Sequence, residues 1–189
     1  MTSDRFPFLV IGIVLASFLV LIAVFRSLVL PALAIVLNLI TVGAAFGILA
    51  LLFQGDGPFN DPGFIDAVSA SGIFCVLFGL SIDYQVFLIT RMREGWERTG
   101  DTREAIAFGL ERTAGVVTGA AAIMLGVFAA FSVTDVTSIQ QFGLGLAVAV
   151  LIDATVVRLV LLPAAMRWCG KWCWWLPAPL ERRLPVVAA

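Results

Sequence analysis

Five long apolar stretches restrict what this chain can fold into. A helix needs roughly 20 apolar residues to cross a hydrocarbon core of about 30 Å, because each residue adds about 1.5 Å. The stretches cover most of the 189 residues and lie at positions 6–25, 28–53, 64–90, 115–133 and 140–162. We therefore predict an all-α integral membrane protein with five transmembrane helices and no room for a soluble domain of ordinary size.

The composition agrees with a membrane protein and argues against several other classes. Hydrophobic residues make up 61% of the chain, against about 45–50% in soluble domains. The net charge of −1 and the lack of histidine exclude a strongly basic nucleic-acid surface and histidine-based metal or general-base chemistry. Cys169 and Cys173 form a C-x3-C pair without a second ligand pair. We expect no metal, no cofactor and no nucleic-acid partner.

Positive charge is distributed unevenly between the connecting segments. Ten lysines and arginines lie in the turn at Arg26, the loop 91–114 and the tail 164–189, whereas Arg5 alone lies on the other side. Because short segments rich in these residues stay in the cytoplasm, we predict an outside N-terminus and an inside C-terminus. The segments 54–63 and 134–139, whose only charges are aspartates, are then external.

The domain organisation follows from these boundaries. Residues 1–163 form one transmembrane domain, and 164–189 form a cytoplasmic tail rich in Trp, Arg and Pro. The first stretch is longer than the apolar core of a signal peptide and runs on into a second span, so we expect a retained helix. Because only the stub Met1–Arg5 precedes it, the chain is expected to be a fragment or a half-size product.

Three local patterns add detail. In the loop 91–114, Asp101 and Glu104 form a capping-box pattern, which predicts an amphipathic helix along the inner membrane surface. The cluster of Trp172, Trp174 and Trp175 is typical of an interfacial aromatic belt. Small residues recur at four-residue spacing, a pattern that lets helices approach closely within the chain or against a partner. These pairs are Gly43 and Gly47, Gly115 and Gly119, and Gly145 and Ala149.

Asp83 and Tyr84 lie inside the third apolar stretch, eight residues or about 12 Å before Arg91. A carboxylate at the centre of a membrane helix costs roughly 2.5–3.5 kcal/mol, so it is seldom kept without a use. Held between burial and a nearby cation or hydroxyl, such a group can bind and release a proton. The two residues lie about 100° apart around the helix, so each is expected to meet a group on another helix. A structural buried hydrogen bond is the alternative.

Asp153 and Arg158 are the other ionisable groups well inside a span. Asp153 lies ten residues before Pro163, at a depth similar to that of Asp83, and Arg158 lies nearer the inner edge, where it can pair or extend toward water. Ser81 adds polarity to the turn that carries Asp83. We regard Ser81, Asp153 and Arg158 as secondary intramembrane polar sites, and a pair with Arg158 would account for Asp153 structurally.

These residues stand in motifs that carry a resemblance. The chain resembles the C-terminal five-helix transmembrane portion of MmpL-type transporters, a branch of the RND superfamily. The resemblance covers nearly the whole chain and rests chiefly on the runs GLSIDYQVFLITRMRE at 79–94, FGLGLA at 142–147 and LIDATVVR at 151–158. Further matches are Phe25-Arg-Ser27, Asn38, Gly100-Asp101, Ala105-Ile106, Gly109-Leu110, Leu162-Pro-Ala and Trp174-Trp-Leu-Pro.

The resemblance implies a proton-driven exporter of lipids or other hydrophobic products in a bacterial cell membrane. Such transporters have twelve spans in two repeats, each with one span, a large external domain and five further spans. Asp83 and Tyr84 fall on the family's proton-relay pair, and Ile82 stands where methionine is usual. The chain contains no second such pair. A second transporter half or a homo-oligomer is therefore an expected partner, beside the bilayer and a lipid-like substrate.

Two other classes remain open. The first is a non-transporting membrane subunit, or an inactive truncated remnant, that packs against other helices. The second is an intramembrane aspartyl protease, in which Asp83 and Asp153 would share a proton at close range. Asp153 lacks the Gly-Leu-Gly-Asp context of such enzymes, and we expect no enzymatic activity.

Overall fold

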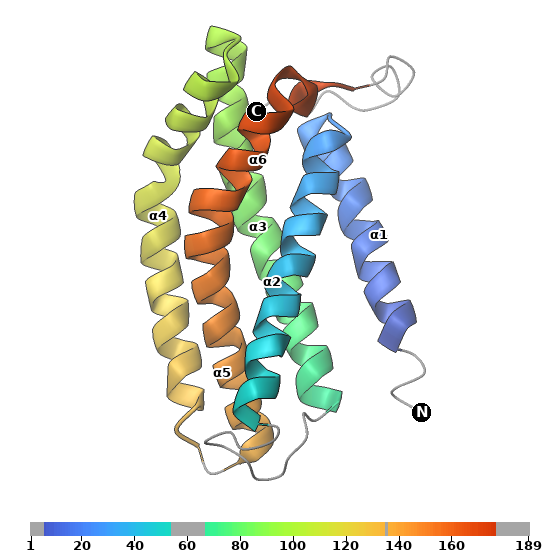
Figure 1. Ribbon diagram of the computed structural model, residues 1–189, viewed down its shortest axis with the longest axis vertical. Coiled ribbons are helices and arrows are strands. Elements are labelled where there is room, and N and C mark those ends of the chain that lie inside the picture. The colour runs from blue at the N-terminus through green and yellow to red at the C-terminus, as the bar shows by residue number, and fades with distance from the viewer. Residues whose placement is uncertain (1–5, 54–66, 135, 177–189) are drawn as a thin grey trace.

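The computed structural model describes residues 6–53, 67–134 and 136–176, and all regular structure in these ranges is helical. The chain passes back and forth five times along one long axis (Figure 1). The expected external segment 54–63, the charges at Arg5 and Asp135, and the tail after 176 lie outside the described residues. The helices are α1 Phe6–Phe25, α2 Val29–Phe53, α3 Ala67–Thr99, α4 Thr102–Phe131, α5 Thr137–Ile152, the π-helix η1 Asp153–Leu161, α6 Leu162–Cys169 and the 3-10 turn η2 Gly170–Trp174.

Length and apolar character make most of these helices candidate membrane spans. Within the described residues, four are long enough: Val29–Phe53, Ser69–Thr99, Thr102–Phe131 and the continuous Thr137–Trp174. The described part of α1 adds a shorter apolar helix, Val10–Phe25. The expected all-helical architecture is confirmed. Which end of the bundle faces the cytoplasm stays a prediction.

The loop 91–114 does not form a separate surface helix. Instead α3 continues to Thr99 and α4 begins at Thr102, so the two helices form one long hairpin. Gly100 turns the chain with a φ of +66°, in the left-handed region that glycine tolerates. Asp101 caps α4 by accepting a 2.7 Å hydrogen bond from the Arg103 N–H.

Close packing explains why the hairpin stays together. A Cβ at Gly95 would lie 2.9 Å from the Cα of Ala105 on the opposite helix. The Asp101 N–H bonds to the Thr99 hydroxyl at 3.3 Å, so Thr99 has the role that the sequence pattern predicted for Glu104. Glycine-mediated contact thus favours the hairpin over an amphipathic helix along the membrane surface.

The last helix runs past the predicted end at residue 162. It changes from α5 to the π-helix η1 and then continues as α6, with Pro163 in the first turn of α6. Proline normally breaks a helix because it lacks an N–H and its ring clashes with a carbonyl one turn back. In the wider π-register the Leu162 N–H bonds to the Val157 carbonyl, five residues back. The helix therefore passes Pro163 without ending.

One end of the bundle is tied together by short polar contacts. Arg93 on α3 donates to the carbonyl of Phe25, the last residue of α1. The Ser27 hydroxyl donates to the carbonyl of Cys173 at 2.6 Å and accepts from the Leu30 N–H at 3.4 Å. The α1–α2 turn, the tip of the α3–α4 hairpin and η2 therefore lie at the same end (Figure 1). This is the end that carries the basic connecting segments.

Some of the small residues and tryptophans pack inside the chain, and others face outward. Gly145 packs inside the chain, since a Cβ there would lie 2.7 Å from Ile73 Cδ1, whereas Gly43, Gly47, Gly115 and Gly119 have open space at that position. Among the tryptophans, Trp172 and Trp175 are exposed as a belt requires. Trp174 instead stacks on Trp96 of α3 with ring centroids 5.4 Å apart.

Candidate functional site

A buried polar layer crosses the middle of the bundle. It separates one apolar cluster, which includes Phe25 and Met92, from a second one, which includes Phe53 and Phe78. All members of the layer are almost fully buried. They are Asn38 on α2, Ser81 and Gln85 on α3, and Asp153 and Arg158 on η1.

Ser81 is the centre of this layer. Its hydroxyl oxygen lies 2.6 Å from Asn38 Oδ1 and 3.0 Å from Asp153 Oδ1. Gln85, one turn further along α3, donates its Nε2 to the same Asn38 oxygen at 3.1 Å. These contacts join α2, α3 and η1 at one level. These contacts place Asp153 at the level of the helical turn that carries Asp83, as the sequence predicted.

Asp153 and Arg158 form a buried ion pair because of the π-helix. In an α-helix, residues five apart lie about 140° apart around the axis and do not meet. In a π-helix the hydrogen bonds join residues five apart, which brings positions 153 and 158 to the same side. Arg158 Nη2 donates to Asp153 Oδ2 and also lies 3.4 Å from the Ser81 carbonyl. Short π-helical segments often occur at functional sites.

Tyr84 connects this layer to α4. The Arg158 guanidinium lies over its ring at 4.7 Å from the centroid, a cation–π contact. Its hydroxyl lies 4.0 Å from Met124 Sδ on α4, a weak acceptor. A cavity of about 10 Å³, room for about one water molecule, is lined by Ser81, Tyr84, Met124, Asp153 and Arg158 among others. Tyr84 therefore meets groups on other helices, as the sequence predicted.

Asp83 differs from every other polar group in the middle of the bundle. It is exposed, and the described residues provide it with no hydrogen-bond or ionic partner. It belongs to an outward-facing stripe of α3 with four-residue spacing: Cys75, Gly79, Asp83, Phe87 and Arg91 are all exposed. The expected contact of Asp83 with another helix is not made by any helix of the described chain.

The geometry contradicts the protease alternative. Asp83 lies two residues after Ser81, about 200° around the helix, while Asp153 is bonded to Ser81 on the inner side. Two carboxyls on opposite faces of α3 cannot share a proton. Within the described residues no group of three or more Cys, Asp or Glu side chains is placed to hold a metal ion.

Two members of the layer were not identified as site residues from the sequence. Both are buried at its centre, where Asn38 accepts hydrogen bonds through Oδ1 and Gln85 donates one of them. The available signal was a lone amide in an otherwise apolar stretch, since a polar group there is costly unless it finds a partner. Such a signal marks a buried contact without identifying the partner helix.

Fold and site together define a class of protein. Apolar helices enclose ionisable and polar side chains at mid-length, an arrangement that is rare in membrane proteins and typical of those that move ions or solutes. A family model for the MMPL family matches residues 1–186, and the chain belongs to this family.

Known relatives support this membership. Over 96% of its length the chain is 43% identical to a putative membrane protein of Streptomyces coelicolor. Over the same share it is 39% identical to the mycolic acid-containing lipids exporter MmpL11 of Mycolicibacterium smegmatis, and 39% identical to the heme uptake protein MmpL11 of Mycobacterium tuberculosis. The sequence-based recognition is therefore confirmed, and the family comprises multi-pass bacterial membrane transporters, not enzymes.

The chain spans only part of these relatives. It corresponds to 26% of the length of the Streptomyces protein and to 19% of each MmpL11 protein. The described helices therefore match one portion of each of these longer proteins.

Proposed function

We propose that this chain is the C-terminal transmembrane portion of an MmpL-type transporter that couples proton entry to export of a lipid or another hydrophobic product. Asp83 and Tyr84 are the proton-relay residues, and the end with the α3–α4 hairpin tip faces the cytoplasm. Family membership, the basic residues at that end and the polar layer at mid-length support this proposal.

The outward position of Asp83 carries the proposal. A carboxylate at mid-length in an apolar helix needs a partner, and the described helices supply none for Asp83. Repeat-built transporters place their coupling-ion sites where two repeats meet. A second transporter half, or a second copy of this chain, would cover the stripe of Cys75, Gly79 and Asp83 and complete the site.

The polar layer offers a route by which protonation reaches the bundle interior. The Ser81 hydroxyl has one hydrogen, yet its oxygen lies within bonding distance of both Asn38 Oδ1 and Asp153 Oδ1. If Asp153 is ionised, Ser81 donates to it and accepts from the Asn38 amide in its other orientation; the Gln85 amide must then be turned as well, so that its oxygen accepts from Asn38. If Asp153 is protonated, it donates to Ser81, which then donates to Asn38. A proton on Asp153 thus reverses the direction of this hydrogen-bond chain.

Tyr84 is adjacent in sequence to Asp83 and contacts the partner of Asp153. It directly follows Asp83, which lies on the outer face. The Arg158 guanidinium lies over the Tyr84 ring, and Tyr84 and Asp153 line the same cavity. Movement of Arg158 on protonation of Asp153 would be transmitted to Tyr84 and hence to the Asp83 turn. In this scheme Asp83 takes up the proton first, and the proton then reaches Asp153, whose pairing with Arg158 changes.

The substrate class rests on the relatives. One MmpL11 protein is named as an exporter of mycolic acid-containing lipids and another as a heme uptake protein. Both cargoes have extensive apolar surface, which suits a path along apolar helices. We propose a lipid-like molecule for this chain.

The decisive experiment compares Asp83→Asn with the parent in the complete transporter, reconstituted in vesicles with an imposed proton gradient. Proton-coupled export should be abolished, because asparagine cannot carry the proton. Glu97→Gln, an exposed carboxylate outside the apolar stretch, is the matched control and should leave export unchanged. Undiminished export by Asp83→Asn would refute the relay.

A non-transporting subunit is the competing function. Its support is the open space at Gly43, Gly47, Gly115 and Gly119, which suits close contact with other helices. This role predicts that Asp83→Asn leaves proton flux unchanged and that Gly119→Leu disrupts a complex. Flux that depends on Asp83 contradicts it.

A further inference from the structure

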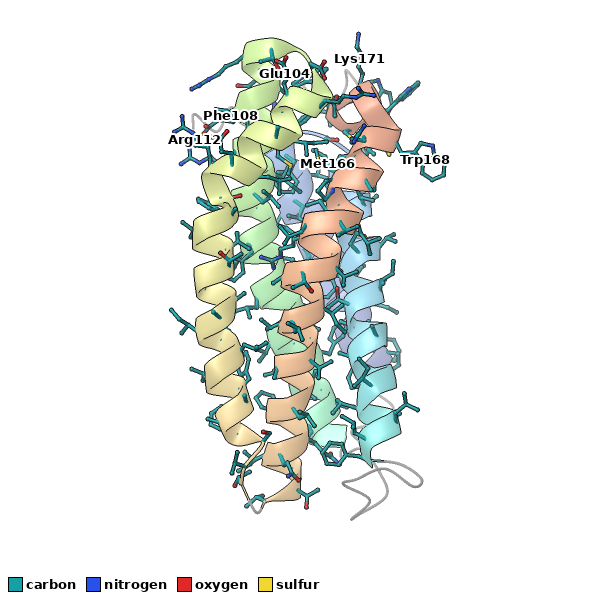
Figure 2. The ribbon with its side chains drawn as sticks, turned by 60° about the vertical axis from the view of Figure 1, so that its left-hand side comes forward. Glu104, Phe108, Arg112, Met166, Trp168 and Lys171 are labelled. Atoms are coloured by element: carbon teal, nitrogen blue, oxygen red, sulfur yellow. The ribbon has the colours of Figure 1, made fainter. Side chains whose placement is uncertain are left out.

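A second polar site lies away from the buried layer, on the outer side of the α3–α4 hairpin. It is a cavity of about 280 Å³, many times the ~10–15 Å³ that one water molecule needs. Its walls come from both helices, with charged and aromatic side chains: Phe87, Arg91, Glu94, Arg98, Phe108 and Arg112. Figure 2 shows Phe108 and Arg112 near the hairpin tip, on the side away from Trp168.

The charges in this cavity do not cancel. Arg91 is paired with Glu94, with one guanidinium nitrogen 2.7 and 3.0 Å from the two carboxylate oxygens. Arg98 and Arg112 have no acidic partner among the described residues. Both guanidinium groups instead stand over the ring of Phe108, each 5.2 Å from its centroid. Two like charges are thus held at one aromatic side chain, with their remaining N–H groups free to bind an anion.

The height of the cavity along the helices is informative. Arg91 directly follows the apolar stretch 64–90, and Arg112 lies three residues before the apolar stretch 115–133. The cavity is therefore level with the boundary between apolar and polar segments on both helices. Below it, the outer side of α4 presents exposed apolar side chains at Val116, Ile123 and Val127. Acyl chains fit that surface, and a headgroup attached to them reaches the arginines.

We propose that this cavity, the Arg98–Phe108–Arg112 site, binds the phosphate headgroup of an anionic phospholipid of the inner leaflet. Planar guanidinium groups bind phosphate oxygens in pairs, and basic pockets between helices on the cytoplasmic side are suited to lipid headgroups. The inference rests on the membrane orientation under the proposed function. It does not require that the chain transports anything, and bound lipid would anchor the hairpin tip at the membrane boundary.

Native mass spectrometry of the purified protein in detergent tests this site, with phosphatidylglycerol or phosphatidylcholine added at matched concentrations. Each basic residue near a membrane surface contributes about 1 kcal/mol, which is about fivefold in affinity. Arg98→Gln and Arg112→Gln should each weaken phosphatidylglycerol retention about fivefold, and the double variant about thirtyfold. Arg103→Gln, an exposed arginine at the same end but outside the cavity, should change it less than twofold.

The controls separate the proposal from its competitors. Equal losses in Arg98→Gln, Arg112→Gln and Arg103→Gln would overturn it in favour of general charge attraction. Equal retention of the two lipids would also overturn it. Inorganic phosphate is added alone in a third arm, and displacement of the lipid by phosphate at the same concentration would identify a soluble anion as the ligand. Since no arm measures transport, lipid binding can fail or succeed independently of the proton relay.

Discussion

The two faces of α3 treat their polar residues in opposite ways. On the inner face, Ser81 and Gln85 are buried and bonded to α2 and η1. On the outer face, Asp83 lies at the same level, exposed and without a partner in the described part of the chain. One face is complete within this chain, and the other needs a group from outside it.

This difference separates stability from function along one helix. The ion pair of Asp153 and Arg158 holds η1 against α3, so its loss should be felt by the isolated chain. Asp83 makes no comparable contact in the isolated chain. The free-energy cost of its carboxylate in a membrane must therefore be offset by an interaction with a group outside this chain. Stability measurements on the chain alone can therefore break or sharpen the comparison.

The largest expected effect comes from Arg158→Leu. It leaves Asp153 buried without its cation, a change that typically costs about 3–5 kcal/mol. Thermal unfolding in detergent, followed by circular dichroism, should show a large loss of stability. The double variant Asp153→Leu/Arg158→Leu should recover most of it, because neither buried charge remains. A melting temperature of Arg158→Leu equal to that of the parent would show that the pair contributes little.

Gly143→Ala is expected to come next. A Cβ at Gly143 would lie 2.5 Å from Phe131 Cβ and 2.8 Å from the Phe128 carbonyl oxygen, so α4 and α5 must separate. Such overpacking costs about 1–3 kcal/mol. Gly119→Ala, with nothing within 4 Å, is the matched outward control and should be neutral or stabilising by up to ~1 kcal/mol. Similar losses from both would mean that outward glycines also pack within the chain.

Ser81→Ala should have a smaller effect on the same inner face. It removes the hydroxyl between Asn38 and Asp153, while Gln85 and Arg158 still satisfy those two groups in part. We expect a loss of about 1–2 kcal/mol in unfolding free energy. Thr155→Ala, which removes an exposed hydroxyl bonded only within its own helix, is the control. An unfolding free energy of Ser81→Ala equal to that of the parent would show that the ion pair alone stabilises the layer.

Asp83→Asn should have the smallest effect on the isolated chain. Substitutions without a broken contact usually stay within about 0.5 kcal/mol, so the unfolding midpoint in detergent should match that of the parent. The same variant is the one expected to abolish proton-coupled export in the complete transporter. A destabilisation as large as that of Ser81→Ala would reveal a partner for Asp83 inside the chain.

The sequence predicted much of this molecule and missed particular elements for physical reasons. It singled out Asp83, Tyr84, Ser81, Asp153 and Arg158 because each is polar within an apolar stretch, and the structure brings the last four together. It predicted a surface helix in the loop 91–114, because a capping pattern is local and says nothing of the glycine contacts that align α3 and α4. It ended the last helix before Pro163, because proline normally breaks a helix and the sequence gives no local sign of the π-register that precedes it.

The sequence by itself determined that the chain is helical and membrane-embedded, where its apolar stretches lie, and that it belongs among MMPL transporters, since hydropathy and motifs add up along the chain. The tertiary structure alone decided which way each polar residue faces. Lipid is as apolar as a protein interior, so an apolar helix carries no hydrophobic preference for either face. Only packing against α2, α4 and η1 turned Ser81 inward and left Asp83 outside.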